Sequence, residues 1–310
     1  MKFAWIVVAG LMMASRVAAA GEAPSVLFIG NSFTYAHFSS VWFYRADTVT
    51  DLNGQGIGGM PALFKSFTQQ AGIDYDVFLE TMGGAGLDDH LEKKLGVIGK
   101  RGWDKVVMHG FSTLDPDKPR DPAKLIATAK QMADFLREHN PKVELYMMAT
   151  QPRADETYPK GGAWHGESIE AMARDVRAAY DRAAKGAAVK LVIPVGEAWI
   201  RAMQTGVADP NPYDGIDEGK LDLWAHDHYH ASEYGIYLEA LVVFGSLTGR
   251  DPRSLGEHEC SAFELGLSRA QVRALQKVAF DQLASARIVE PNPNVTPKPM
   301  RERCKLKGAQ

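Results

Sequence analysis

The chain has 310 residues, a length that suits one large or two small domains. Hydrophobic residues make up 45% of the chain and charged residues 24%, as in ordinary globular proteins. The formal net charge of −3 and the lack of a basic run argue against nucleic acid as a partner.

The N-terminal segment has the layout of a secretory signal peptide. Lys2 precedes an apolar run over residues 3–13, and three alanines that end at Ala20 form a small-residue cleavage site. The run is shorter than the roughly 20 apolar residues that a membrane-spanning helix needs. We therefore expect residues 1–20 to be removed and the mature protein to be secreted or periplasmic, without stable insertion in a membrane.

Apolar, β-branched runs alternate with helical patterns along the rest of the chain. The expected strands are residues 26–29, 76–80, 105–109, 143–149 and 190–195. The best-marked helices are expected at about residues 59–70, 122–141, 169–183 and 232–247. This alternation predicts a parallel five-stranded sheet with helices on both faces, a three-layer α/β/α sandwich of the flavodoxin-like type.

The C-terminal end of the chain differs in composition from the predicted domain. We expect the domain to cover residues 21–285, and the tail over residues 286–310, rich in Pro, Lys and Arg, to be extended. If the protein is exported, Cys260 and Cys304 can form a disulfide that ties the tail to the domain, and two free thiols are the alternative. The sequence does not predict an oligomeric state.

The loops that follow the strands are the expected place for a functional site. In sheets of this type, ligands bind at the carboxyl ends of the strands. The first strand ends on Gly30-Asn31-Ser32, the second runs into a glycine-rich stretch over residues 82–86, and the third ends on His109. The hydroxyl of Ser32 is a candidate nucleophile if a base can reach it.

Asp227 and His230 can supply that base from the other end of the chain. An Asp three residues before a His, in a turn ahead of a helix, can accept a hydrogen bond from Nδ1–H. Nε2 is then free to take a proton from a serine, so Ser32, Asp227 and His230 form a predicted catalytic triad. α/β-Hydrolases share this chain order, but Ser32 lacks their Gly-x-Ser-x-Gly elbow.

These short stretches together resemble the sequence blocks of SGNH (GDSL-type) hydrolases. Gly30-Asn31-Ser32 resembles the Gly-Asp-Ser block, with Asn31 in place of the usual Asp, and Asp227-x-x-His230 resembles the closing block. The resemblance covers about residues 25–247. It implies the SGNH fold and a carboxylic-ester hydrolase that needs no cofactor and no metal.

The resemblance also implies which groups hold the oxyanion. The backbone N–H of Ser32 is one donor, and that of Gly84 is the second, with Gly83 and Gly86 as alternates. The third block of the family, Gly-x-Asn-Asp, supplies a donating Asn side chain, but Ser112 stands at that position here.

Two residues at the end of the third expected strand can replace the missing donor. Ser112 can donate through its hydroxyl and His109 through a ring N–H, and we take Ser112 as the third donor. Loss of one oxyanion donor typically costs about 10²–10³ in rate. We therefore interpret the chain as a divergent but active member of the family.

The substrate is predicted less directly. Export and the aromatic residues in the long loops favour removal of acetyl-like acyl groups from a carbohydrate or a related small ester. Trp164 and Trp224 lie in these loops and can either stack on a sugar ring or pack at the surface.

Three alternative functions remain open. A lipid-directed esterase or lysophospholipase would share every catalytic residue, and a catalytically degenerate carbohydrate-binding protein would keep only the fold. A metal-dependent hydrolase would use the histidines around Asp227, namely His226, His228 and His230, but no second ligand cluster is evident.

Overall fold

The computed structural model describes residues 23–291, and a six-stranded sheet forms its centre. The strand order is β2-β3-β1-β4-β5-β6, and every adjacent pair is parallel. The strands are β1 (Ser25–Gly30), β2 (Thr50–Asp51), β3 (Asp76–Thr81), β4 (Lys105–Met108), β5 (Glu144–Ala149) and β6 (Leu191–Pro194). The five predicted strands are confirmed. The predicted count was one too low, because the edge strand β2 has only two residues and therefore no readable period.

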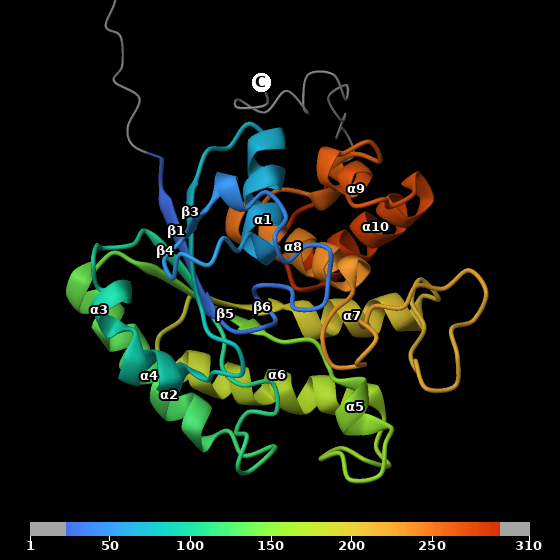
Figure 1. Cartoon of the computed structure of the whole chain (residues 1–310), viewed down its shortest axis with the longest axis horizontal. Helices are drawn as coiled ribbons and strands as arrows, with labels where there is room; N and C mark the ends of the chain where they lie inside the picture. Colours follow the sequence, from blue (N-terminus) through green and yellow to red (C-terminus); the bar gives the residue numbers. More distant parts are fainter. Residues whose placement is uncertain (1–22, 292–310) are drawn as a thin grey trace, which may run out of the picture.

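Helices cover both faces of the sheet, which confirms the predicted three layers (Figure 1). The longer helices are α1 (Gly59–Gln70), α4 (Ala123–His139), α6 (Ile169–Gly186), α7 (Val195–Gln204), α8 (Glu233–Thr248) and α10 (Arg269–Ser285). The shorter ones are α2 (Leu87–Lys93), α3 (Leu95–Ile98), α5 (Ala154–Thr157), α9 (Cys260–Glu264) and the 3₁₀ turns Ala46–Thr48 and Pro252–Leu255. In Figure 1, α1, α8 and α10 lie on one side of the sheet, and α2, α4 and α6 lie on the other.

β1 illustrates why the strands appear in the sequence as continuous apolar runs. Val26 and Phe28 belong to the core on the α1 and α8 side, whereas Leu27 and Ile29 belong to the core on the α4 and α6 side. Each of these side chains is at most 1% exposed. A central parallel strand that is buried on both faces cannot alternate apolar and polar residues, and its carboxyl end opens between the two layers.

Several predictions concern the ends of the chain. The predicted signal peptide, residues 1–20, lies outside the described residues, as does Cys304. Cys260 is buried at the start of α9. Because Cys304 lies outside the described residues, the disulfide between the two stays a prediction. α10 ends at Ser285, and only residues up to 291 of the predicted tail are described. No helix within residues 23–291 is long and apolar enough to cross a membrane.

Candidate active site

The turn after β1 requires glycine at position 30. A Cβ on Gly30 would lie 2.2 Å from Thr34 Oγ1 and 2.4 Å from His109 Nε2. These two atoms are themselves joined by a 2.7 Å hydrogen bond that crosses beneath the turn. The backbone of β1 therefore approaches the end of β4 more closely than any side chain would allow, and Ser32 follows directly after this contact.

Asn31 ties the turn to the loop after β3. Its Nδ2 donates to the Ala85 carbonyl at 2.9 Å, and its Oδ1 accepts from the Phe33 N–H at 3.1 Å. An aspartate could make only the second of these bonds, and its other oxygen would face a carbonyl. The departure from the family's Gly-Asp-Ser block thus has a local physical reason, since an amide is both donor and acceptor.

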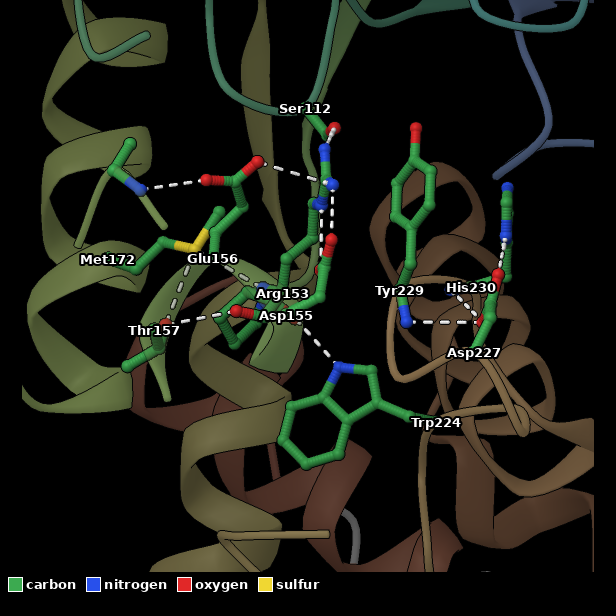
Figure 2. A network of polar contacts seen from close by, with 12 residues as sticks. Ser112, Arg153, Asp155, Glu156, Thr157, Met172, Trp224, Asp227, Tyr229 and His230 are labelled. Carbon is green, nitrogen blue, oxygen red and sulfur yellow. Dashed lines mark hydrogen bonds and ion pairs between the residues drawn. The ribbon is translucent and has the colours of Figure 1, made fainter. Parts of the chain in front are cut away.

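Asp227 and His230 form a hydrogen-bonded pair in the turn before α8 (Figure 2). His230 Nδ1 lies 2.6 Å from Asp227 Oδ2, and Asp227 Oδ1 accepts from the backbone N–H of Tyr229 at 3.1 Å and of His230 at 3.0 Å. Burial raises the pKa of Asp227, but these hydrogen bonds outweigh it and the pKa falls below its ordinary value. The ionised carboxylate therefore selects the tautomer in which Nδ1 carries the proton.

The other ring nitrogen of His230 is available as a base. Within the described residues, Nε2 is buried and has no hydrogen-bond partner. Burial lowers the pKa of His230, and the hydrogen bond that its Nδ1–H donates to Asp227 opposes this only in part, so the ring is neutral near pH 7. A neutral, oriented imidazole with a free Nε2 can accept a proton.

The loop that carries Ser32 packs against this imidazole. The ring of His230 lies 5.8 Å from Phe33, 5.0 Å from His37 and 5.6 Å from Phe38, measured between ring centroids. Ser32 itself is 6% exposed. Tertiary structure thus places the proposed nucleophile and base on two loops in contact, although about 195 positions separate them in the chain.

Two of the predicted oxyanion donors have free N–H groups. Within residues 23–291, neither the Ser32 N–H nor the Gly84 N–H makes a hydrogen bond. Gly84 has φ of +70° and open space where a Cβ would be. The Gly86 N–H, in contrast, donates to Asp89 Oδ2 at 3.2 Å. Gly84 is therefore better suited than the alternate Gly86.

The hydrogen-bond partners of Ser112 and His109 favour Ser112 as the proposed third donor. His109 has both ring nitrogens engaged, Nε2 with Thr34 Oγ1 and Nδ1 with the Gly110 carbonyl at 3.0 Å. Burial lowers the pKa of His109 to about 4, so the ring is neutral and has no spare N–H. Ser112 Oγ accepts a hydrogen bond from Arg153 Nη1 at 3.1 Å, which leaves its own hydrogen free to donate.

Arg153, after β5, was not predicted as a site residue. Figure 2 shows its guanidinium group between Ser112 and the carboxylates of Asp155 and Glu156. Asp155 binds Nε at 3.0 Å and Nη2 at 2.5 Å, and Glu156 lies 3.3 Å from Nη2. The guanidinium carbon also lies 3.6 Å from the ring centroid of Tyr229, next to His230. Its place at the end of a strand was the only sequence signal, and that signal is shared by every residue in these loops.

The two loop tryptophans have structural roles. Trp164 and Trp224 are 0% and 2% exposed, so the predictions that they stack on a sugar or pack at the surface are wrong. The Trp164 indole donates to Asp175 Oδ2 at 2.9 Å, and the Trp224 indole donates to the Pro152 carbonyl at 3.0 Å. Both therefore brace the loop after β5, from which Arg153 projects.

The histidines beside Asp227 do not gather around one point. His226 packs on Phe38 with 4.6 Å between ring centroids, and His228 packs on Tyr213 at 4.5 Å. Among residues 23–291, no group of three or more His, Cys, Asp or Glu side chains is placed to hold a metal ion.

The fold and the position of this site define the chain as a three-layer α/β/α protein with a polar site at the carboxyl ends of β1, β3, β4 and β5. No protein-family model and no curated protein sequence matches the chain. Solved structures match it over 72–89% of its length.

Three solved structures share this architecture at low sequence identity. A DUF4886 family protein from Bacteroides uniformis has a TM-score of 0.59 and 17% identity, over 89% of this chain and 100% of its own. An alpha/beta hydrolase enzyme from the metagenome of Lake Arreo, Spain, has a TM-score of 0.51 and 16% identity, over 72% and 95%. A putative GDSL-like lipase from Parabacteroides merdae has a TM-score of 0.50 and 14% identity, over 73% and 95%. The chain therefore has the fold of a GDSL-like protein, as the sequence resemblance predicted.

Proposed function

We propose that this protein is a serine ester hydrolase that removes short, acetyl-like acyl groups from a carbohydrate or a related small ester. The observation that carries the proposal is the Asp227–His230 pair. Nε2 of His230 is buried and has no hydrogen-bond partner within the described residues, and the His230 ring packs against the loop that carries Ser32. His90 also pairs with a carboxylate, that of Glu80, and its buried Nε2 also has no partner within the described residues. His230 differs from it because its ring packs against the loop that carries Ser32.

The proposed reaction has two acyl-transfer steps. Ser32 Oγ attacks the ester carbonyl while its proton passes to His230 Nε2, and Asp227 stabilises the imidazolium. The N–H groups of Ser32 and Gly84 and the hydroxyl of Ser112 hold the oxyanion. Collapse of the tetrahedral intermediate breaks the bond to the alcohol, which takes the proton from His230.

Water completes the cycle on the acyl-enzyme. His230 removes a proton from water as the oxygen attacks the acyl carbonyl, and it then returns a proton to Ser32 Oγ. The products are the free alcohol and a carboxylic acid. Every group in this scheme belongs to the chain, to the substrate or to water. We further propose that the enzyme acts after export through the predicted signal peptide.

A serine-reactive phosphonate tests the proposed nucleophile. We expect a fluorophosphonate to label the protein once, and peptide mass spectrometry to map the label to Ser32. Ser32→Ala should abolish both labelling and ester hydrolysis without a change in melting temperature. Labelling at another residue, or a wild type inert to esters and phosphonate alike, would contradict the mechanism. The second result would favour the carbohydrate-binding alternative.

Acyl chain length separates the proposal from a lipid-directed esterase. Nitrophenyl esters from acetate to decanoate should show kcat/KM highest for acetate and falling beyond butyrate. A maximum at octanoate or decanoate would favour the lipid-directed alternative, which uses the same catalytic residues.

A further inference from the structure

A cavity of about 550 Å³ opens beside the proposed active site. We call it the aromatic groove, and its relevant lining residues are Tyr35, Trp42, Phe43, Gln55, Gly83 and Lys94. Tyr35 is three residues past Ser32, and Gly83 directly precedes Gly84. The groove therefore borders both the nucleophile loop and the loop of a proposed oxyanion donor.

Three stacked rings form one wall of the aromatic groove. Tyr35 and Trp42 have centroids 5.4 Å apart at an interplanar angle of 23°, and Trp42 and Phe43 lie 5.0 Å apart at 9°. Phe43 is 61% exposed, so much of its ring is open to a ligand. The negative faces of aromatic rings attract polarised C–H groups such as those on the flat side of a sugar ring.

One imidazole ring separates this wall from the catalytic base. The His37 ring lies 4.4 Å from Trp42 and 5.0 Å from His230, measured between centroids. A ligand that binds to this wall would therefore contact an aromatic cluster that continues, through His37, to the triad.

The polar groups of the groove suit an uncharged ligand. Lys94 Nζ donates to Asn53 Oδ1 at 2.6 Å and lies 3.8 Å from a carboxylate oxygen of Glu80, which is fully buried. The Glu80 charge opposes that of Lys94, so the groove offers no uncompensated cation for an acid. The Gln55 side chain is exposed and makes no hydrogen bond within the described residues, so its amide can bind hydroxyl groups.

We infer that the aromatic groove binds the alcohol part of the substrate as an uncharged pyranose ring, while Ser32 attacks an acetyl-like group carried on it. This inference rests on the proposed function and names the residues that determine its specificity. A few polar groups around aromatic faces are typical of small-molecule sites. Ile57 and Met82 are the aliphatic members of the lining, and the other side chains named above are aromatic or polar.

A comparison of two esters with the same acyl group tests the inference. Acetylated methyl glucopyranoside carries a sugar ring, and ethyl acetate has an alcohol too small to reach the groove. In Phe43→Ala and Trp42→Ala we expect kcat/KM for the sugar ester to fall about tenfold, mainly through KM, as for loss of one stacking contact. The value for ethyl acetate should stay within about twofold.

Two further variants are controls for loss of stability and for loss of an exposed aromatic side chain elsewhere. Trp42→Phe keeps a flat ring and should retain most of the activity on the sugar ester, even if Trp42→Ala is unstable. Phe263→Ala removes an aromatic side chain on α9 that is 71% exposed and does not line the groove, and it should leave both substrates unaffected.

The outcomes separate the groove from the catalytic site. If the groove variants lower kcat/KM equally for both esters, or for neither, the inference is wrong and the proposed function stands. If their effect instead grows from ethyl acetate to ethyl hexanoate, the groove holds the acyl chain and the inference is also wrong. If the wild type hydrolyses neither ester, the proposed function fails and the inference fails with it.

Discussion

At the scale of single residues, the proposed site depends on which group forms a hydrogen bond with each polar atom. Ser112 takes the place of a donating asparagine, and its oxygen is bound by Arg153 at 3.1 Å. A charged donor on the serine oxygen polarises the hydroxyl and orients its hydrogen away from the guanidinium group. Arg153 is thus a positioning residue in the proposed mechanism, and Ser112 is the group that would touch the reacting atoms.

Substitution of these two residues tests that division of roles. We expect Ser112→Ala to lower kcat by about 10²-fold, as for loss of an oxyanion donor. Arg153→Met should lower kcat by about tenfold in the wild type with little change in KM, and far less in the Ser112→Ala background, because its effect passes through the serine.

Arg153→Lys is the control for charge, since it keeps a cation beside Asp155 but cannot reproduce the fork of donors. Steady-state kinetics and melting temperatures on all four variants distinguish the outcomes. Additive losses of kcat from Arg153→Met and Ser112→Ala would show that Arg153 acts independently of Ser112.

At the scale of elements, the close packing of β1 against the end of β4 positions the nucleophile loop. Local patterns were sufficient to predict five of the six strands and four helices. The predicted strands are continuous apolar runs, and the predicted helices have apolar residues repeated at the helical period. α7 and α10 were not assigned. α7 begins at Val195 directly after β6, with no intervening loop. The apolar run of the strand therefore passes into the apolar stripe of the helix without a turn residue between them.

The glycine at the end of β1 tests this packing. In Gly30→Ala, the new Cβ would displace Thr34 and His109, and we expect the free energy of unfolding to fall by about 1–3 kcal/mol or more. The value of kcat should fall by more than the loss of folded protein explains, because the turn that carries Ser32 must move.

Gly186→Ala is the matched control. It lies in the last turn of α6 with nothing within 4 Å of the new Cβ, so stability should be unchanged or slightly higher. Urea denaturation and kcat for an acetate ester measure both effects. A Gly30→Ala protein as stable and active as Gly186→Ala would contradict the role given to the close approach.

At the scale of the whole molecule, the core contains an acidic group that its stability should reveal. Glu239 lies in α8 and is 0% exposed, and the indole N–H of Trp199 is the neighbouring donor that acts on its carboxyl group. Burial raises the pKa of Glu239 well above its ordinary value. The folded protein therefore holds this proton more tightly than the unfolded chain does.

The sign of the pH dependence follows from this difference. Below the unfolded pKa of about 4.3, both states are protonated and Glu239 costs nothing. As pH rises above that value, only the unfolded chain loses the proton, so stability declines until the folded pKa is reached. Glu239→Gln removes the ionisation, and we expect it to raise the melting temperature by at least about 2–4 °C at pH 8 but little at pH 4.5.

Calorimetry at the two pH values checks this expectation. Glu138→Gln, on the exposed face of α4, should change the melting temperature little at either pH. An equal loss of stability at both pH values in Glu239→Gln would show that the carboxyl group is not the source of the pH dependence.

The sequence by itself determined the alternating strands and helices, the turn at Gly30-Asn31-Ser32 and the pairing of Asp227 with His230. Each of these is set by residues within a few positions of one another, through periodicity, a tight turn or a three-residue spacing. The tertiary structure alone decided which side chain supports Ser112, the burial of Trp164 and Trp224, and the aromatic groove. These features join loops that follow different strands, and the strand order that brings the loops together depends on the packing of the whole sheet.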